Sequence, residues 1–141
     1  MKKAFWALTS AVMLLTVLAL PARPADVAVI VNKANSNAVD KAMIKKIFSG
    51  DTNSWPDGGA ITPIDQPEDN PLRDSFYSSV LGKSSYNMKS IWAQKIFTGS
   101  GVPPKVAGSD DEVKKTVAGN KNAIGYIKSS SLDDSVKAVL K

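Results

Sequence analysis

The sequence predicts an α/β fold, with a central mixed β-sheet flanked by helices. Short runs of β-branched and apolar residues alternate along the chain with segments in which apolar residues recur every three or four positions. This alternation of predicted strands and helices is typical of α/β domains. The length of 141 residues allows one domain, and we find no internal repeat or long linker that would divide it.

The first 25 residues have the pattern of a secretory signal peptide. Two lysines at positions 2 and 3 precede an apolar run over residues 4–20, and small residues follow it. The run is shorter than the ~20 apolar residues that span a bilayer comfortably. We expect cleavage after Ala25 and export to the periplasm; cleavage after Ala22 and an uncleaved anchor are the alternatives. Contact with a membrane is expected only through the uncleaved precursor.

The composition excludes several function classes. The chain has no Cys and no His, which rules out disulfides, thiol or histidine catalysis and the usual zinc sites. Removal of residues 1–25 leaves 15 basic and 13 acidic residues, and no basic run with interleaved aromatics indicates a nucleic-acid surface. We expect no enzyme, no cofactor, no metal and no nucleic-acid partner. A Ser/Lys hydrolase is the remaining enzymatic alternative, and no spacing indicates one.

The mature domain, residues 26–141, begins with a predicted strand and helix. Residues 26–32 form a continuous β-branched run, typical of a strand that is buried on both faces. An amphipathic helix follows, because apolar residues recur at four-residue spacing up to a terminating Gly50. The residues expected on its buried face are Val39, Ala42, Met43, Ile47 and Phe48.

A loop and a short strand come next. The strand is predicted over residues 60–64, where Pro63 favours an edge or a strand end. Trp55 lies in the preceding loop and is either a core residue or a ligand-stacking aromatic.

Two helices are predicted in the middle of the chain. The first runs from Pro71 to Gly82, and the second is capped by Ser84 or Ser85 and ends at Gly99. The residues expected on the inner face of the second helix are Met88, Ile91, Trp92 and Ile96.

The last third alternates again between strands and a helix. Residues 105–107 predict a minimal strand, and a capping box from Ser109 to Glu112 opens a helix that ends at Gly119. Residues 123–127 predict a strand, and residues 136–140 form a last strand or a short helix, of which we favour the strand.

The candidate binding site is the start of the helix at residue 71. Asn70 fits the N-cap position and Pro71 the first helical position, so the N–H groups of Leu72 and Arg73 are free. Arg73 adds a guanidinium fork that suits an oxyanion. Ser109, at the start of a later helix, is a second candidate anion donor. The alternative is that both places are ordinary helix caps.

Five segments in a fixed order resemble a known family. They are Ile47-Phe-Ser-Gly50, Trp55-Pro-Asp-Gly58, Ile61-Thr-Pro-Ile64, Leu72-Arg-Asp-Ser-Phe76 with Val80-Leu-Gly82, and Ala123-Ile-Gly-Tyr-Ile127. This order resembles the phosphate ABC-transporter substrate-binding proteins of the type 2 periplasmic-binding-protein superfamily, and in particular their small single-lobe members. The resemblance implies a single periplasmic-binding-protein-like lobe that binds an oxyanion without catalysis.

The resemblance places Asp69-Asn70-Pro71-Leu72-Arg73 where the family has its phosphate loop, Gly-Ser-Gly-Thr-Arg. Arg73 matches, whereas the glycines and hydroxyl residues do not. The family's transport receptors have two lobes, and this chain is long enough for one, so a homodimer or another protein would supply the other half of the cleft.

We therefore expect an exported solute-binding module that binds a small, phosphate-like oxyanion around Asn70, Leu72 and Arg73. The alternative is a ligand-free interaction module that docks on a membrane sensor, a transporter or another envelope protein, which the acidic, glycine-free loop over residues 68–72 favours.

Overall fold

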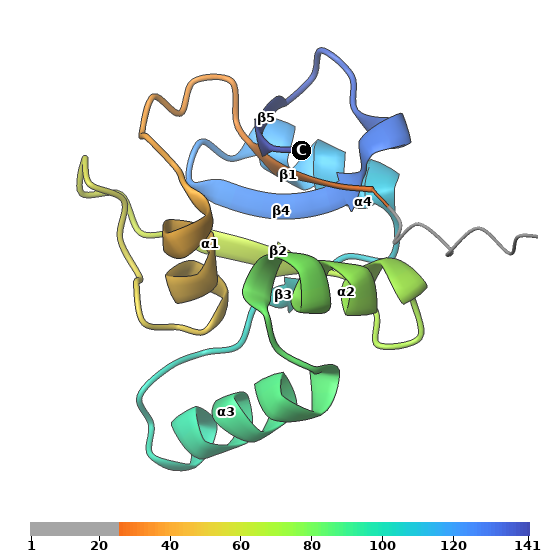
Figure 1. Ribbon diagram of the computed structural model, residues 1–141. Helices are drawn as coiled ribbons and strands as arrows, with labels where there is room; N and C mark the ends of the chain where they lie inside the picture. The colour runs from red at the N-terminus through yellow and green to blue at the C-terminus, as the bar shows by residue number, and fades with distance from the viewer. Residues whose placement is uncertain (1–25) are drawn as a thin grey trace, which may run out of the picture.

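A five-stranded mixed sheet lies at the centre of the computed structural model, which describes residues 26–141 (Figure 1). The strand order is β3-β2-β4-β1-β5. The predicted signal peptide and both of its cleavage sites lie outside the described residues. The strands are β1 (Val27–Val31), β2 (Thr62–Asp65), β3 (Lys105–Val106), β4 (Ala123–Lys128) and β5 (Lys137–Leu140).

The pairing of the strands makes the sheet mixed. β2 runs parallel to both β3 and β4, whereas β1 is antiparallel to both β4 and β5. The predicted α/β class with a central mixed sheet is thereby confirmed, and the last segment of the chain is a strand, as favoured.

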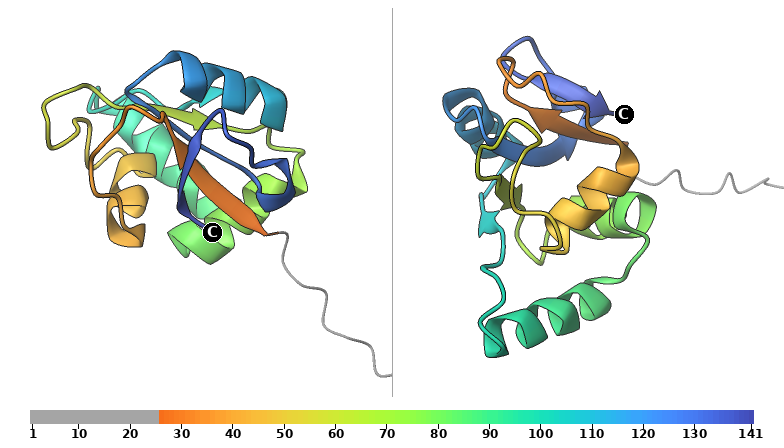
Figure 2. Two further views of the ribbon diagram at one scale, coloured as in Figure 1. Left: turned by 90° about the horizontal axis from the view of Figure 1, so that it is seen from above. Right: turned by 90° about the vertical axis from the view of Figure 1, so that its left-hand side faces the viewer.

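Helices cover both faces of this sheet. α1 and α2 lie on one side and α4 lies on the other, while α3 lies farther from the sheet (Figures 1 and 2). The helical elements are α1 (Lys41–Phe48), α2 (Pro71–Phe76), the π-helical segment η1 (Tyr77–Leu81), α3 (Ser85–Phe97), α4 (Asp110–Gly119) and the 3-10 turn η2 (Ser129–Ser131).

The sheet separates two hydrophobic cores. All five residues of β1 are buried, and their side chains alternate between the two cores. Val29 packs with the apolar residues of α1, α2 and η1, whereas Ile30 packs with those of α4. The continuous apolar run at the start of the mature chain therefore forms the doubly buried strand that the sequence predicts.

Helix α1 starts later than its apolar spacing suggests. The Asp40 side chain caps the helix by accepting a hydrogen bond from the Met43 N–H. Val39 therefore lies before the first residue of the helix. The placement of Ala42 on the buried face is wrong, because Ala42 is exposed, and Ile44 is fully buried instead.

The helix predicted from Pro71 to Gly82 consists of two parts. α2 continues without a break into η1, and Gly82 ends the segment with a φ of +67°. Ser84 caps α3 by accepting from the Asn87 N–H, as predicted. The inward placement of Ile96 is wrong, because 55% of it is exposed. Only the first turns of α3 reach the core.

The two tryptophans of the described region have structural roles. Trp55 is 2% exposed, and its Nε1–H donates to the Asn122 carbonyl at 3.1 Å, so it is a core residue. The half-buried Trp92 donates from Nε1 to the Phe48 carbonyl at 3.1 Å and ties α3 to α1.

Gly125 in β4 is required by the packing of α4 on the sheet. A Cβ at Gly125 would lie 2.6 Å from Cγ1 of Val113, well inside van der Waals contact. Gly125→Ala is expected to lower the free energy of unfolding by about 1–3 kcal/mol through overpacking. Urea unfolding measures this change.

Gly119 provides the matched control for this substitution. A Cβ at this position would meet no atom within 4 Å, and the residue ends α4. Gly119→Ala is expected to leave the stability unchanged or to raise it by up to about 1 kcal/mol. Equal stabilities of the two variants would contradict the packing argument.

Candidate functional site

The predicted cap at the start of α2 forms. Its hydrogen bonds use the backbone N–H groups that the sequence predicts to be free to bind an anion. Oδ1 of Asn70 accepts the N–H of Leu72 at 3.0 Å, and Nδ2 of Asn70 donates to Oε1 of Gln66 at 2.7 Å. Pro71 takes the first helical position. The N–H of Arg73 donates to the Asn70 carbonyl at 3.0 Å. The expectation that the N–H groups of Leu72 and Arg73 are free is therefore wrong, because both bond to Asn70.

Arg73 points towards the end of β2 and is held there by three groups. Its Nε donates to the Tyr77 hydroxyl at 3.0 Å, and its Nη1 donates to the Gln66 carbonyl at 3.2 Å. Nε also lies 3.9 Å from Oδ1 of Asp65, and 15% of the side chain is exposed. Burial lowers the pKa of Arg73, but the charge of Asp65 and the contact with Tyr77 raise it overall.

Asp65 is the centre of this cluster. It ends β2 and is 4% exposed. Its carboxylate accepts hydrogen bonds from the hydroxyls of Tyr77 and Tyr126 and from the Gln66 N–H. Burial is the largest cause that raises the pKa of each tyrosine hydroxyl far above the value of a free tyrosine, and the charge of Asp65 is the second. Both hydroxyls therefore remain protonated donors at neutral pH.

Gln66 connects the cluster to α4. Its fully buried side chain donates from Nε2 to Oδ1 of Asp110 and to the Tyr126 carbonyl, each at 2.8 Å. Asp110 in turn accepts from the Ser131 hydroxyl at 2.7 Å. The network thus joins β2, β4, η2 and the starts of α2 and α4.

Six residues of this network were not among the candidates predicted from the sequence. These are Asp65, Gln66, Tyr77, Asp110, Tyr126 and Ser131. Tyr126 belongs to one of the segments quoted for the resemblance, and Asp65 follows a predicted strand. A polar residue at the carboxyl end of a strand in an α/β sheet is the signal that points to such a site.

A groove of about 430 Å³ opens beside Arg73, between α2, α3 and the loop before β3. Its volume exceeds that of four other hollows on the described residues, which measure about 210–340 Å³. The polar residues that line it are Asp65, Glu68, Arg73, Tyr77 and Lys89. The apolar lining consists of Met88, Trp92, Ala93, Ile96, Pro103, Pro104 and Val106.

Ser109 lies outside this groove. Its hydroxyl accepts the Glu112 N–H at 3.3 Å and caps α4, while Oε2 of Glu112 accepts the Gly108 N–H at 2.6 Å. The predicted capping box therefore forms, with Gly108 rather than Ser109 as the backbone donor. The structure does not bring Ser109 together with Arg73 in one pocket.

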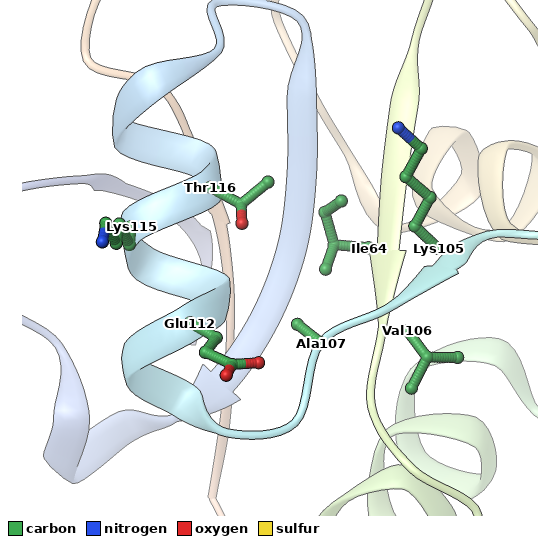
Figure 3. Close-up of a pocket in the computed structure, with 7 residues that line it drawn as sticks. All are labelled: Ile64, Lys105, Val106, Ala107, Glu112, Lys115 and Thr116. Carbon is green, nitrogen blue, oxygen red and sulfur yellow. The ribbon is translucent and has the colours of Figure 1, made fainter.

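A second, smaller hollow of about 250 Å³ lies between β3 and α4 (Figure 3). Figure 3 shows Glu112 and Thr116 facing it from α4, and Ile64 facing it from β2. Glu112 is already engaged by the cap of α4. This hollow offers no converging set of free polar groups, so the groove beside Arg73 is the better candidate site.

Within the part of the chain that the structure describes, no group of three or more carboxylates is placed to hold a metal ion. Across the same residues, no helix is long and apolar enough to cross a membrane.

An α/β lobe with a groove at the carboxyl end of a parallel strand is the architecture of a solute-binding lobe. The comparisons with known proteins agree with this class. A family described as "PBP superfamily domain" matches residues 18–139. The chain belongs to this family.

Solved structures of phosphate-binding proteins share the fold. A phosphate transport receptor from Vibrio cholerae aligns with a TM-score of 0.63 and 22% identity over 81% of this chain and 45% of its own. A putative phosphate ABC-transporter substrate-binding protein from Clostridium perfringens, with bound phosphate, aligns with a TM-score of 0.65 and 26% identity over 81% of this chain and 44% of its own.

The chain thus spans less than half the length of these receptors. The resemblance to phosphate ABC-transporter substrate-binding proteins is confirmed, and the described residues form a single lobe. Among curated proteins, no sequence matches the chain.

Proposed function

We propose that the chain is an exported, non-enzymatic solute-binding module in which the groove beside Arg73 is half of a ligand site. The observation that carries the proposal is the fixed position of Arg73. Two of its nitrogens bond within the protein, while Nη2 makes no hydrogen bond to any residue of 26–141. A guanidinium that is already oriented loses little entropy when it binds an anion.

The proposed ligand is a small oxyanion, and phosphate is the first to test. A relative that is 26% identical was solved with bound phosphate. The carboxylate of Asp65 makes no hydrogen bond to Arg73, because its oxygens accept from two tyrosine hydroxyls and one N–H, so Nη2 of Arg73 stays available. Lys89 lines the same groove and adds a second cation.

The other half of the site comes from outside this lobe in our proposal, either from a second copy of the chain or from an envelope partner. Export to the periplasm is supported by the lysine pair and apolar run of residues 1–25. With a partner present, the groove closes over the ligand and excludes water, which strengthens the charge interactions.

Thermal unfolding of residues 26–141 with phosphate, sulfate and carboxylates at matched ionic strength tests the oxyanion proposal. At a ligand concentration about 100 times Kd, a ligand that binds only the folded state adds about 2.7 kcal/mol to the free energy of unfolding. This corresponds to a rise in Tm of several degrees. We expect Arg73→Gln to abolish the rise caused by phosphate.

The readout is the ligand-dependent rise of each variant, so a lower Tm of unliganded Arg73→Gln does not affect the comparison. Lys121→Gln, at an exposed lysine that does not line the groove, is the control and should keep the full rise. A rise that persists in Arg73→Gln removes Arg73 from the site, and no rise with any anion refutes oxyanion binding by the lone lobe.

A docking module without a ligand is the second candidate function. Glu68 lines the groove, and Glu68 and the next residue, Asp69, are both exposed. Two carboxylates at this place oppose a free anion and suit a cationic partner surface. Co-purification of an envelope protein together with indifference to anions would favour this function.

A further inference from the structure

Four of the five exposed large hydrophobic residues of the described region lie between the end of α3 and β3. Ile96, Phe97, Val102 and Val106 are 55%, 92%, 84% and 60% exposed. They belong to the end of α3, the loop after it and β3, and we call these four residues the apolar tip. Figure 1 shows α3 beyond α2, away from the sheet, and the loop after α3 returning to β3 at the edge of the sheet.

The exposure is concentrated in one segment. Every large hydrophobic residue that is exposed within residues 26–141 lies between Tyr86 and Val106. Single exposed apolar residues need no explanation, but a cluster rimmed by polar residues marks an interaction surface. α3 carries Tyr86 and Phe97 on its exposed side although Met88 faces the core, so it is apolar on two sides. A helix of this kind is normally covered on both of them.

The charge of the segment is one-sided. From Ser75 to Ser109 the sequence contains no Asp or Glu and four lysines: Lys83, Lys89, Lys95 and Lys105. Lys95 pairs with Asp51 at 2.9 Å. The other three form no ion pair with any residue of 26–141. The groove that Ile96 and Val106 line also contains Arg73, Glu68 and the buried Asp65, and the hollow beside Val106 contains Glu112 and Lys115. The positive charge that the segment itself adds is that of its three lysines without an ion pair in residues 26–141.

We propose that the apolar tip and these lysines bind the surface of an anionic lipid bilayer. The sequence predicts membrane contact only through the uncleaved precursor, and this surface is a second route to a membrane. Aromatic and aliphatic side chains surrounded by lysines are typical of proteins that lie on anionic membranes. No helix of the described region spans a bilayer, so this contact is peripheral.

The choice of a membrane over a protein partner rests on the type of cation. Protein–protein interfaces are enriched in Arg and depleted of Lys, because a hydrated ammonium is costly to bury. All four cations of the segment are lysines. A bilayer surface attracts lysines without desolvating them, while the apolar tip enters the headgroup region.

Co-sedimentation with vesicles tests the proposal. Residues 26–141 contain the whole sheet and both cores, so this segment serves as the test protein, with cooperative melting as the check of its fold. Vesicles of phosphatidylglycerol and phosphatidylcholine are compared with vesicles of phosphatidylcholine alone. We expect binding to the anionic vesicles that falls as salt rises, and little binding to the neutral ones.

Two double variants separate the apolar and the electrostatic contributions. Phe97→Ser with Val102→Ser is expected to lower binding at least ~10-fold, because two side chains no longer enter the lipid. Lys89→Glu with Lys105→Glu should abolish the preference for anionic vesicles. Lys33→Glu with Lys121→Glu makes the same change of net charge at exposed lysines outside the segment and should bind as the parent does.

Failure to sediment with anionic vesicles overturns the proposal, and so does equal binding by the tip variant and the parent. Size-exclusion chromatography with light scattering measures whether residues 26–141 form a dimer. A dimer that dissociates in Phe97→Ser with Val102→Ser would assign the tip to a second copy of the chain and overturn the assignment to lipid.

Discussion

Asp65→Ala is expected to lower the free energy of unfolding by about 3–5 kcal/mol, as is typical when one partner of a buried charge pair is removed. The substitution leaves the largely buried Arg73 without its counter-charge and leaves the hydroxyls of Tyr77 and Tyr126 without their acceptor. Because the Arg73–Asp65 distance of 3.9 Å is long for an ion pair, the tyrosine hydrogen bonds contribute much of this loss. Urea unfolding monitored by circular dichroism measures it.

Two further variants define what Asp65 contributes. Asp65→Asn keeps the shape and one acceptor oxygen and removes only the charge, so we expect a smaller loss than for alanine. Asp133→Ala removes an exposed carboxylate that pairs with Lys114, and should cost no more than about 1 kcal/mol. If Asp65→Ala were as stable as Asp133→Ala, the network around Asp65 would not stabilise the fold.

Phe76→Ala is expected to lower the free energy of unfolding by about 3–5 kcal/mol, through lost burial and the cavity left behind. Phe76 is fully buried, stacks on Tyr126 with ring centroids 3.9 Å apart and meets Phe48 edge-on at 4.9 Å. The same ring packs beside the tyrosine that holds Asp65, so its loss should also weaken any anion-dependent rise in Tm. Chemical unfolding and the thermal-shift series measure the two effects.

Phe97→Ala is the matched control for Phe76→Ala, because it removes the same side chain from a site that is 92% exposed. We expect a change within about 0.5 kcal/mol. A large loss of stability in Phe97→Ala would show that the end of α3 is packed against the domain, which would also contradict the lipid-binding surface.

The order and type of the elements were predictable because each depends on local pattern. The β-branched run of β1, the capping residues Asn70, Ser84 and Ser109 and the terminating Gly82 act within a few residues of their own position. The prediction that Ile96 faces the core is wrong because burial depends on more than local pattern. The helical spacing of Ile96 is that of a core residue, but at this turn of α3 it lines the open groove instead of the core, and spacing carries no information about what a helix face packs against.

The candidate site was predictable only in part. The sequence indicated Arg73 and the cap formed by Asn70, because both follow from the start of one helix. It gave no indication that Arg73 meets Asp65 and Tyr77, or that Tyr126 arrives from β4 some 60 positions away. Long-range partners such as these depend on strand order and register, which no local pattern encodes.

By itself, the sequence determined the α/β class, the resemblance to solute-binding proteins and the absence of cysteine and histidine chemistry. Only the tertiary structure decided that the predicted cap is used internally, that Arg73 is oriented by a buried carboxylate, and that the apolar tip is uncovered. The physical reason is that secondary structure and composition express short-range preferences. The environment of a charge and the exposure of an apolar side chain depend instead on which distant segments pack against them.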